Sequence, residues 1–218
     1  MRLSRCLALL VVAAAVVAAV GGVRARPTPK PNVLLITLDT FRADAVGRGD
    51  TPALDAFAAE ATRFPGARTV APLTFVVHAT LFSGLQPGRH GVHDNAAPPV
   101  PPREARAYTL LAEELRDAGY ATGGFGAHAV LAARTGLGAG FDTYSAPDAA
   151  DPEVAAPDQV ARALAWLDAQ PAGRPTFLWV HLFDAHTPCG PYGGDARRAA
   201  SRRADGLHDR YRGEVRRV

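Results

Sequence analysis

Polar side chains that suit chemistry on an anionic group occur at three places in the sequence, each beside an apolar stretch. Asp39 follows the run VLLITL, and Thr74 precedes FVVHATLF, whose spacing is helical. His181, Asp184 and His186 occur together in HLFDAHTP. A carboxylate such as Asp39 could bind a divalent cation, and a hydroxyl at a helix start lies where backbone N–H groups and the helix dipole favour an anion. Each residue alone could be a structural cap, but the three groups together favour an anion-binding site.

The elements that must position these groups follow from the apolar pattern. The predicted strands are 32–38, 120–125 and 176–182, the predicted helices are 51–61, 108–118 and 158–169, and the predicted loops are 98–102 and 146–157. The first strand has the composition of one buried on both faces, and helix 51–61 has Thr51 as its cap with Leu54, Phe57 and Ala58 as core contacts. Strands alternating with helices indicate an α/β fold with a mainly parallel sheet flanked by helices. Because such sheets bind ligands at the carboxyl ends of their strands, Asp39 and the HLFDAHTP segment are expected at one edge.

The two ends of the chain differ from the stretch between them. Basic residues followed by an apolar run from Cys6 to Val23 indicate an export signal over 1–23, and 24–31 is interpreted as a linker. We expect the signal to be cleaved and the protein to be periplasmic or secreted, whereas an uncleaved signal would anchor residues 6–23 in a membrane. Cleavage leaves Cys189 as the remaining cysteine, an incidental thiol with no disulfide partner in the chain.

The charge balance does not indicate a nucleic-acid partner. The chain carries 24 basic and 21 acidic residues, a formal net charge of +3, and loss of Arg2 and Arg5 with the signal leaves it nearly neutral. The segment 193–218 is rich in arginine, but acidic residues alternate with these arginines, so a solvated or disordered tail is expected there.

An ordered series of motifs resembles the N-terminal half of the sulfatase family, within the alkaline phosphatase superfamily. The motifs, in chain order, are PNVLLITLDTFRADAVG, TPALDAFAAEATRFPGA, APLTFVVHATLFSGLQPGRHGVHDN, GYATGGFGAHAVL, GLGAGFDTY and TFLWVHLFDAHTPCGPY. The resemblance implies a sulfatase N-terminal domain over 32–192, with an α/β sandwich and a divalent metal at the carboxyl edge of its sheet. It also implies in-line attack on a small-molecule or glycan ester of sulfate or phosphate.

Residue by residue, the resemblance assigns Asp39 to the first metal-binding carboxylate and Thr74 to the nucleophile position. His186 matches a histidine that contacts the anionic group of the substrate, and Thr40 stands where many members have a second Asp. The metal could be Ca²⁺, Mg²⁺, Mn²⁺ or Zn²⁺.

Two departures from the family pattern change the expected chemistry. Sulfatases convert the Cys or Ser of a Cys/Ser-x-Pro-x-Arg pattern to formylglycine, whereas this chain has TFVVH, from Thr74 to His78. Threonine would give a ketone and the Pro and Arg are missing, so formylglycine is not expected. A lysine expected near GFGAHA is replaced by Ala127, and the neighbouring His128 is interpreted as a satisfied surface histidine.

Two functional interpretations therefore remain open. In the first, unmodified Thr74 is the nucleophile of a metal-dependent phosphoryl or sulfuryl hydrolase, with His78 and His186 supplying hydrogen bonds. Family members carry a further metal-binding Asp with His or Asn well beyond the region that ends here at Val218, so the chain is expected to be truncated and its site incomplete. In the second, the chain is a catalytically inactive exported fragment or an anion-binding module.

Overall fold

The computed structural model describes residues 29–148 and 153–186. The chain divides into two units, 1–31 and 32–218, and residues 29–31 of the first unit carry no regular element. The predicted signal over 1–23, Cys189 and the arginine-rich segment 193–218 all lie outside the described residues. Among the helices that are described, none has the length and apolar character needed to cross a membrane.

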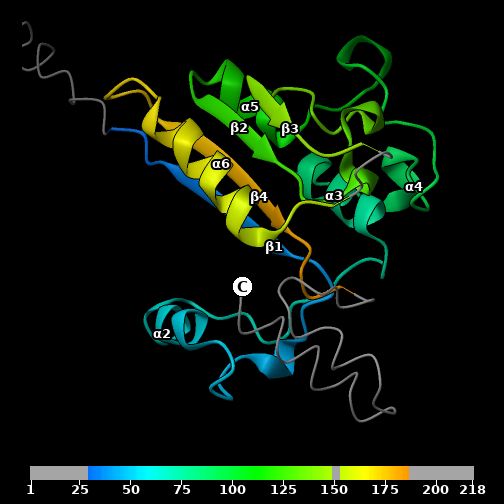
Figure 1. Ribbon diagram of the computed structural model, residues 1–218. Helices are drawn as coiled ribbons and strands as arrows, with labels where there is room; N and C mark the ends of the chain where they lie inside the picture. Colours follow the sequence, from blue (N-terminus) through cyan, green and yellow to red (C-terminus); the bar gives the residue numbers. More distant parts are fainter. Residues whose placement is uncertain (1–28, 149–152, 187–218) are drawn as a thin grey trace, which may run out of the picture. The chain divides into compact units, whose positions relative to one another are not determined.

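Four strands of the second unit form one parallel sheet, as the sequence predicts (Figure 1). They are β1 (Val33–Leu38), β2 (Ala121–Phe125), β3 (Thr143–Ser145) and β4 (Thr176–Leu182), in the spatial order β1-β4-β2-β3. The strand β3 was not predicted, because three residues are too short to show a period. Register pairs Thr37 with His181 and Leu38 with Leu182, so β1 and β4 end side by side.

The two faces of the sheet pack against different helices (Figure 1). Side chains alternate across a strand, so β4 directs Phe177 and Trp179 into a core with helices α3 (Thr74–Ser83) and α5 (Leu111–Asp117). The intervening residues Leu178 and Val180 pack with helix α6 (Ala156–Asp168) on the opposite face.

Close packing of α6 explains the unusual strand sequence ATGGF. The ring of Trp166 on α6 lies so near Gly123 that a β-carbon there would be 2.7 Å from it. A glycine at this point therefore lets the helix approach the sheet.

Shorter elements complete the described part of the chain. These are helices α2 (Pro52–Glu60) and α4 (Pro87–His90) and the 3₁₀ turns η1 (Ala43–Ala45), η2 (Arg103–Ala105), η3 (Ala129–Leu131) and η4 (Ala133–Thr135). The predicted helices agree with α2, α5 and α6 to within a few residues, although α6 begins at Ala156, inside the predicted loop.

Two predictions about burial are wrong for the described residues. Helix α2 has no buried residue and Phe57 is 70% exposed, so its apolar positions are not core contacts. Strand β1 is an edge strand of the described sheet, and one of its faces exposes Leu34 and Ile36 by 61% and 54%. The sequence pattern indicates which apolar residues could be buried, but tertiary packing decides whether another element covers them.

Candidate active site

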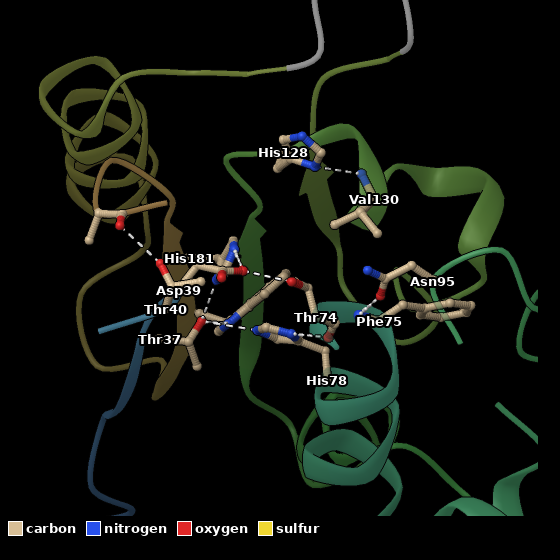
Figure 2. Close-up of polar contacts among 12 residues, drawn as sticks. Thr37, Asp39, Thr40, Thr74, Phe75, His78, Asn95, His128, Val130 and His181 are labelled. Atoms are coloured by element: carbon tan, nitrogen blue, oxygen red, sulfur yellow. Dashed lines mark hydrogen bonds and ion pairs between the residues drawn. The ribbon is translucent and has the colours of Figure 1, made fainter. Parts of the chain in front are cut away.

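Three of the predicted polar residues meet where β1 and β4 end and α3 begins (Figure 2). The hydroxyl of Thr74 donates a hydrogen bond of 2.7 Å to Oδ2 of Asp39, and Nε2 of His181 lies 3.5 Å from the same oxygen. Asp39 directly follows β1, and its backbone N–H donates to the carbonyl of Leu182 at 2.9 Å. The parallel pairing of the two strands therefore places this carboxylate beside His181.

Thr74 is the first residue of α3, one position later than a cap. Leu73 occupies the N-cap position with extended backbone, and its side chain makes no capping hydrogen bond. The side chain of Asn95 accepts a hydrogen bond of 2.9 Å from the backbone N–H of Phe75 instead (Figure 2). One of the helix-start N–H groups expected to face an anion is thus already engaged. The sequence does not indicate this role of Asn95, which lies 20 residues farther along the chain.

His78 supports the first turn of α3 from inside the protein. Its Nδ1 donates to the carbonyl of Thr74 at 2.7 Å, and its Nε2 lies 3.1 Å from the hydroxyl of Thr37. Burial, with the charge of His181 as the next cause, lowers the pKa of His78 to about 3, so the imidazole is neutral at physiological pH. Both ring nitrogens are engaged, so the geometry suits a residue that holds Thr74 in place.

Thr37 connects the two histidines, and the sequence analysis missed it. Its hydroxyl oxygen lies 2.9 Å from Nδ1 of His181 and accepts a hydrogen bond of 3.1 Å from Nε1 of Trp179. The alternation of side chains along a strand could have indicated it, because Thr37 lies two residues before Asp39 and so points to the same side of the chain.

The carboxylate of Asp39 is held in its charged form. Burial acts to raise its pKa, but hydrogen bonding from His181 and Thr74 and the charges of His181 and His186 together lower it below the usual range. The 3.5 Å contact with His181 is a long one, and the charge of the imidazole acts on Asp39 in the same direction as the hydrogen bond.

A cleft of about 480 Å³ opens beside these groups. It is lined by the predicted metal ligand Asp39, the predicted nucleophile Thr74 and the two histidines predicted to assist them, His78 and His186. Its polar lining includes Asp39, Thr74, His78, Asn95, His181 and His186, together with three further threonines, Thr37, Thr40 and Thr69. The volume is in the range of small-molecule sites. The ring of His186 stacks on Phe183 with centroids 4.3 Å apart. The cleft thus places a carboxylate, a hydroxyl and imidazoles around one space.

Other polar residues that follow strands have structural roles. Both carboxylate oxygens of Asp184 accept from the backbone N–H of Ala156, at 3.1 and 3.0 Å, and so cap the start of α6. His128 is half-buried rather than on the surface, and it accepts a hydrogen bond from the N–H of Val130 (Figure 2). Its ring also stacks on Phe183.

Thr40, which stands where a second metal-binding Asp was expected, makes a different contact. It has a left-handed backbone with φ of 50°, which is uncommon for a β-branched residue. Its hydroxyl donates to the carbonyl of Ala185 at 3.0 Å. This bond ties the turn after β1 to the turn after β4.

The sequence model of the sulfatase family matches residues 31–213 of the chain. The chain belongs to the sulfatase family. No curated protein matches it in sequence. Solved structures in the alkaline phosphatase superfamily share its fold, as the sequence motifs imply, and three of them show the degree of similarity.

A protein of this superfamily from Vibrio parahaemolyticus has a TM-score of 0.62 at 15% identity, covering 88% of this chain and 49% of that one. A 2-O GAG sulfatase has a TM-score of 0.59 at 25% identity, covering 74% and 36%. The phosphonate monoester hydrolase of Agrobacterium radiobacter has a TM-score of 0.56 at 20% identity, covering 73% and 42%. The sulfatase-family chain therefore spans between about one third and one half of the length of these relatives.

The described residues of this sulfatase-family chain fit a divalent cation in part. Within 29–148 and 153–186, no group of three or more His, Cys, Asp or Glu side chains could hold a metal ion. Asp39 offers a charged carboxylate, and the Nε2 of His181 is buried with no hydrogen-bond partner among the described residues. The carboxylate of Asp39 and the hydroxyl of Thr74 are thus at hand as oxygen donors, and substrate or solvent would have to complete the coordination.

Proposed function

We propose that the protein is a metal-dependent hydrolase of sulfate or phosphate esters in which unmodified Thr74 is the nucleophile. The observation that supports this most directly is the 2.7 Å hydrogen bond from the hydroxyl of Thr74 to Asp39, inside a cleft that His186 also lines. A hydroxyl bonded to a charged carboxylate is oriented, and its proton has an acceptor. Export of the protein by the segment 1–23 is part of the same proposal.

Each residue of the site has a defined part in this reaction. The oxygen of Thr74 forms a bond to phosphorus or sulfur while the ester oxygen leaves, and water later releases Thr74. Asp39 orients the hydroxyl, and His78 fixes the carbonyl of the same residue. His186 is placed to contact an anionic oxygen of the substrate. A divalent cation held by Asp39 would neutralise charge on the ester and lower the pKa of the attacking hydroxyl.

The relatives support the ester class but not one substrate. They include a 2-O GAG sulfatase and a phosphonate monoester hydrolase. We therefore propose a small-molecule or glycan ester, and the replacement of the formylglycine pattern by TFVVH favours phosphate esters over sulfate esters for this chain.

Replacement of Thr74 tests the nucleophile. We expect Thr74→Ala to lower turnover of aryl phosphate, phosphodiester or sulfate esters by about 10³-fold or more, and Thr74→Ser to retain part of it. Thr69→Ala is a matched control, because Thr69 lines the same cleft but donates its hydroxyl to the carbonyl of Ala71. Equal turnover by Thr74→Ala and the unmodified protein on all three ester classes would overturn the proposal.

A second function, binding of an anion without turnover, is favoured by one observation. The described residues supply fewer than three metal-binding side chains at any one place. Absence of turnover, combined with saturable binding of inorganic phosphate or sulfate that His186→Ala weakens, would establish this alternative. Turnover that depends on Thr74 would exclude it.

A further inference from the structure

Phe183 is a buried aromatic residue that the two apolar cores of the described residues do not account for. It is 7% exposed, yet it belongs to neither of the clusters that pack on the two faces of the sheet. It directly follows β4, at the edge of the sheet where the cleft lies. A large apolar side chain is buried only where other groups cover it, so the groups that cover this ring come from outside those clusters.

Two imidazoles cover the ring of Phe183. His186 stacks on it with ring centroids 4.3 Å apart and an interplanar angle of 14°. His128 stacks on it at 4.1 Å and 21°. Two rings that are nearly parallel to a phenyl ring and so close to its centre cannot share one face, so the imidazoles lie on opposite faces. Phe183 is therefore the middle member of a three-ring stack, and offset stacking of this kind favours particular orientations of the rings.

The turn that carries the stack is held at each of its residues. The N–H of His186 donates to the carbonyl of Phe183 at 2.9 Å, which closes a four-residue turn. Inside the turn, the carboxylate of Asp184 caps the start of α6, and the carbonyl of Ala185 accepts from the hydroxyl of Thr40 at 3.0 Å. The backbone of His186 thus has a defined place, and the stack on Phe183 restricts the rotation that its side chain still has.

The two imidazoles of the stack differ in what they can contact. His186 lines the cleft, whereas His128 is not among the described residues that line it. The Nδ1 of His128 accepts from the N–H of Val130 at 3.1 Å, so this ring is uncharged, and burial, the largest cause, lowers its pKa in the same sense. His128 is therefore fixed by its own turn and supports Phe183 from the side away from His186.

We propose that Phe183 is a positioning residue, which holds the imidazole of His186 against an anionic oxygen of the substrate and is itself supported by His128. The inference rests on the proposed function for the contact between His186 and the substrate, and it adds the two residues that orient that contact. A group that binds a reacting anion has to be held to within a fraction of an ångström, which a histidine on a turn achieves only if its ring is packed.

Calorimetric titration of the whole protein with inorganic phosphate tests this role. Phe183→Leu keeps an apolar side chain but removes the flat face, and we expect it to weaken phosphate binding about three- to tenfold, the range of an aromatic pair. Phe183→Tyr keeps the face and should retain the affinity. Phe125→Leu is the matched control, because Phe125 is also buried at the end of a strand but its ring pairs with Trp166 and packs on the α6 side of the sheet. Circular dichroism establishes that each variant is folded.

A double-mutant cycle separates positioning from a general loss of structure. If Phe183 acts through His186, then Phe183→Leu should have no further effect on phosphate binding once His186 is replaced by alanine. His128→Ala should weaken binding less than Phe183→Leu, and it too should have no effect in the His186→Ala background. A weakening of equal size in both backgrounds would overturn the inference, as would equal weakening by Phe183→Leu and Phe125→Leu.

A second measurement needs neither ligand nor turnover. A proton above a phenyl face is shielded by the ring current, so the ring protons of His186 should resonate upfield of those of an exposed histidine. Phe183→Leu should move them downfield, and comparison with the spectrum of His186→Ala assigns them. Resonances that Phe183→Leu leaves unmoved would overturn the inference. Dependence of turnover on Thr74 is measured separately, so the proposed nucleophile could fail while this stack stands, or the reverse.

Discussion

The buried side chains of the site are linked by hydrogen bonds that share a small number of polar hydrogens. Thr37, His78 and His181 form one chain of hydrogen bonds in which each donor and acceptor is determined by its neighbour. Asp39 lies beside this chain, with its Oδ2 3.5 Å from Nε2 of His181, and it accepts the hydrogen bond from the hydroxyl of Thr74. Because low-dielectric surroundings strengthen such networks and penalise gaps in them, single substitutions should affect both stability and the orientation of Thr74.

Burial of His78 gives the stability of the protein a pH dependence. Its pKa is about 3 in the folded state, against about 6.5 in an unfolded chain. Between these values the unfolded state binds a proton that the folded state does not, so stability falls as the pH drops below about 6.5, by up to about 1.4 kcal/mol per pH unit. Above that pH this contribution is fully present.

Urea unfolding at pH 7 and pH 5 measures this effect. We expect His78→Gln to lower stability at pH 7 but to reduce the loss between the two pH values. His93→Gln, at an exposed histidine, should keep the loss of the unmodified protein. An unchanged pH dependence in folded His78→Gln would show that other groups cause it.

The elements that carry the site were predictable where their patterns are local. The apolar runs that became β1 and β4 and the helical spacing that became α3 identify both strand ends and the position of Thr74. The pairing of Thr37 with His181 was not predictable, because it joins residues 144 positions apart through the register of two parallel strands. The same limit applies to Asp184, whose role as the cap of α6 depends on where that helix begins in space.

The start of α3 depends on a side chain from another segment. Asn95 accepts from the N–H of Phe75, a group that the helix itself leaves without an intrahelical partner. We expect Asn95→Ala to lower the free energy of unfolding by about 1 kcal/mol, as loss of a helix cap does. It should also lower kcat, because Thr74 is the adjacent residue. Asn95→Asp keeps an acceptor oxygen and should retain stability. Equal stability of both variants in urea would contradict this capping role.

At the scale of the molecule, the described sheet has an apolar edge. The exposed side chains Leu34 and Ile36 of β1 lie with Val160 and Leu164 of α6 around one apolar groove. Exposed patches of this kind commonly mark contact surfaces. This chain covers between 36% and 49% of the length of the three related structures described above.

Export of the protein makes a prediction about its cysteines, which counting thiols can check. The sequence contains two, Cys6 within the proposed signal 1–23 and Cys189 outside it. If the signal is cleaved, the denatured exported protein should react with one equivalent of a thiol reagent per chain, and its intact mass should lack residues 1–23. An uncleaved anchor would give two equivalents and the full mass, and the protein would then sediment with membranes. Pretreatment with a reductant is the control, because an intermolecular disulfide through Cys189 would otherwise lower the count.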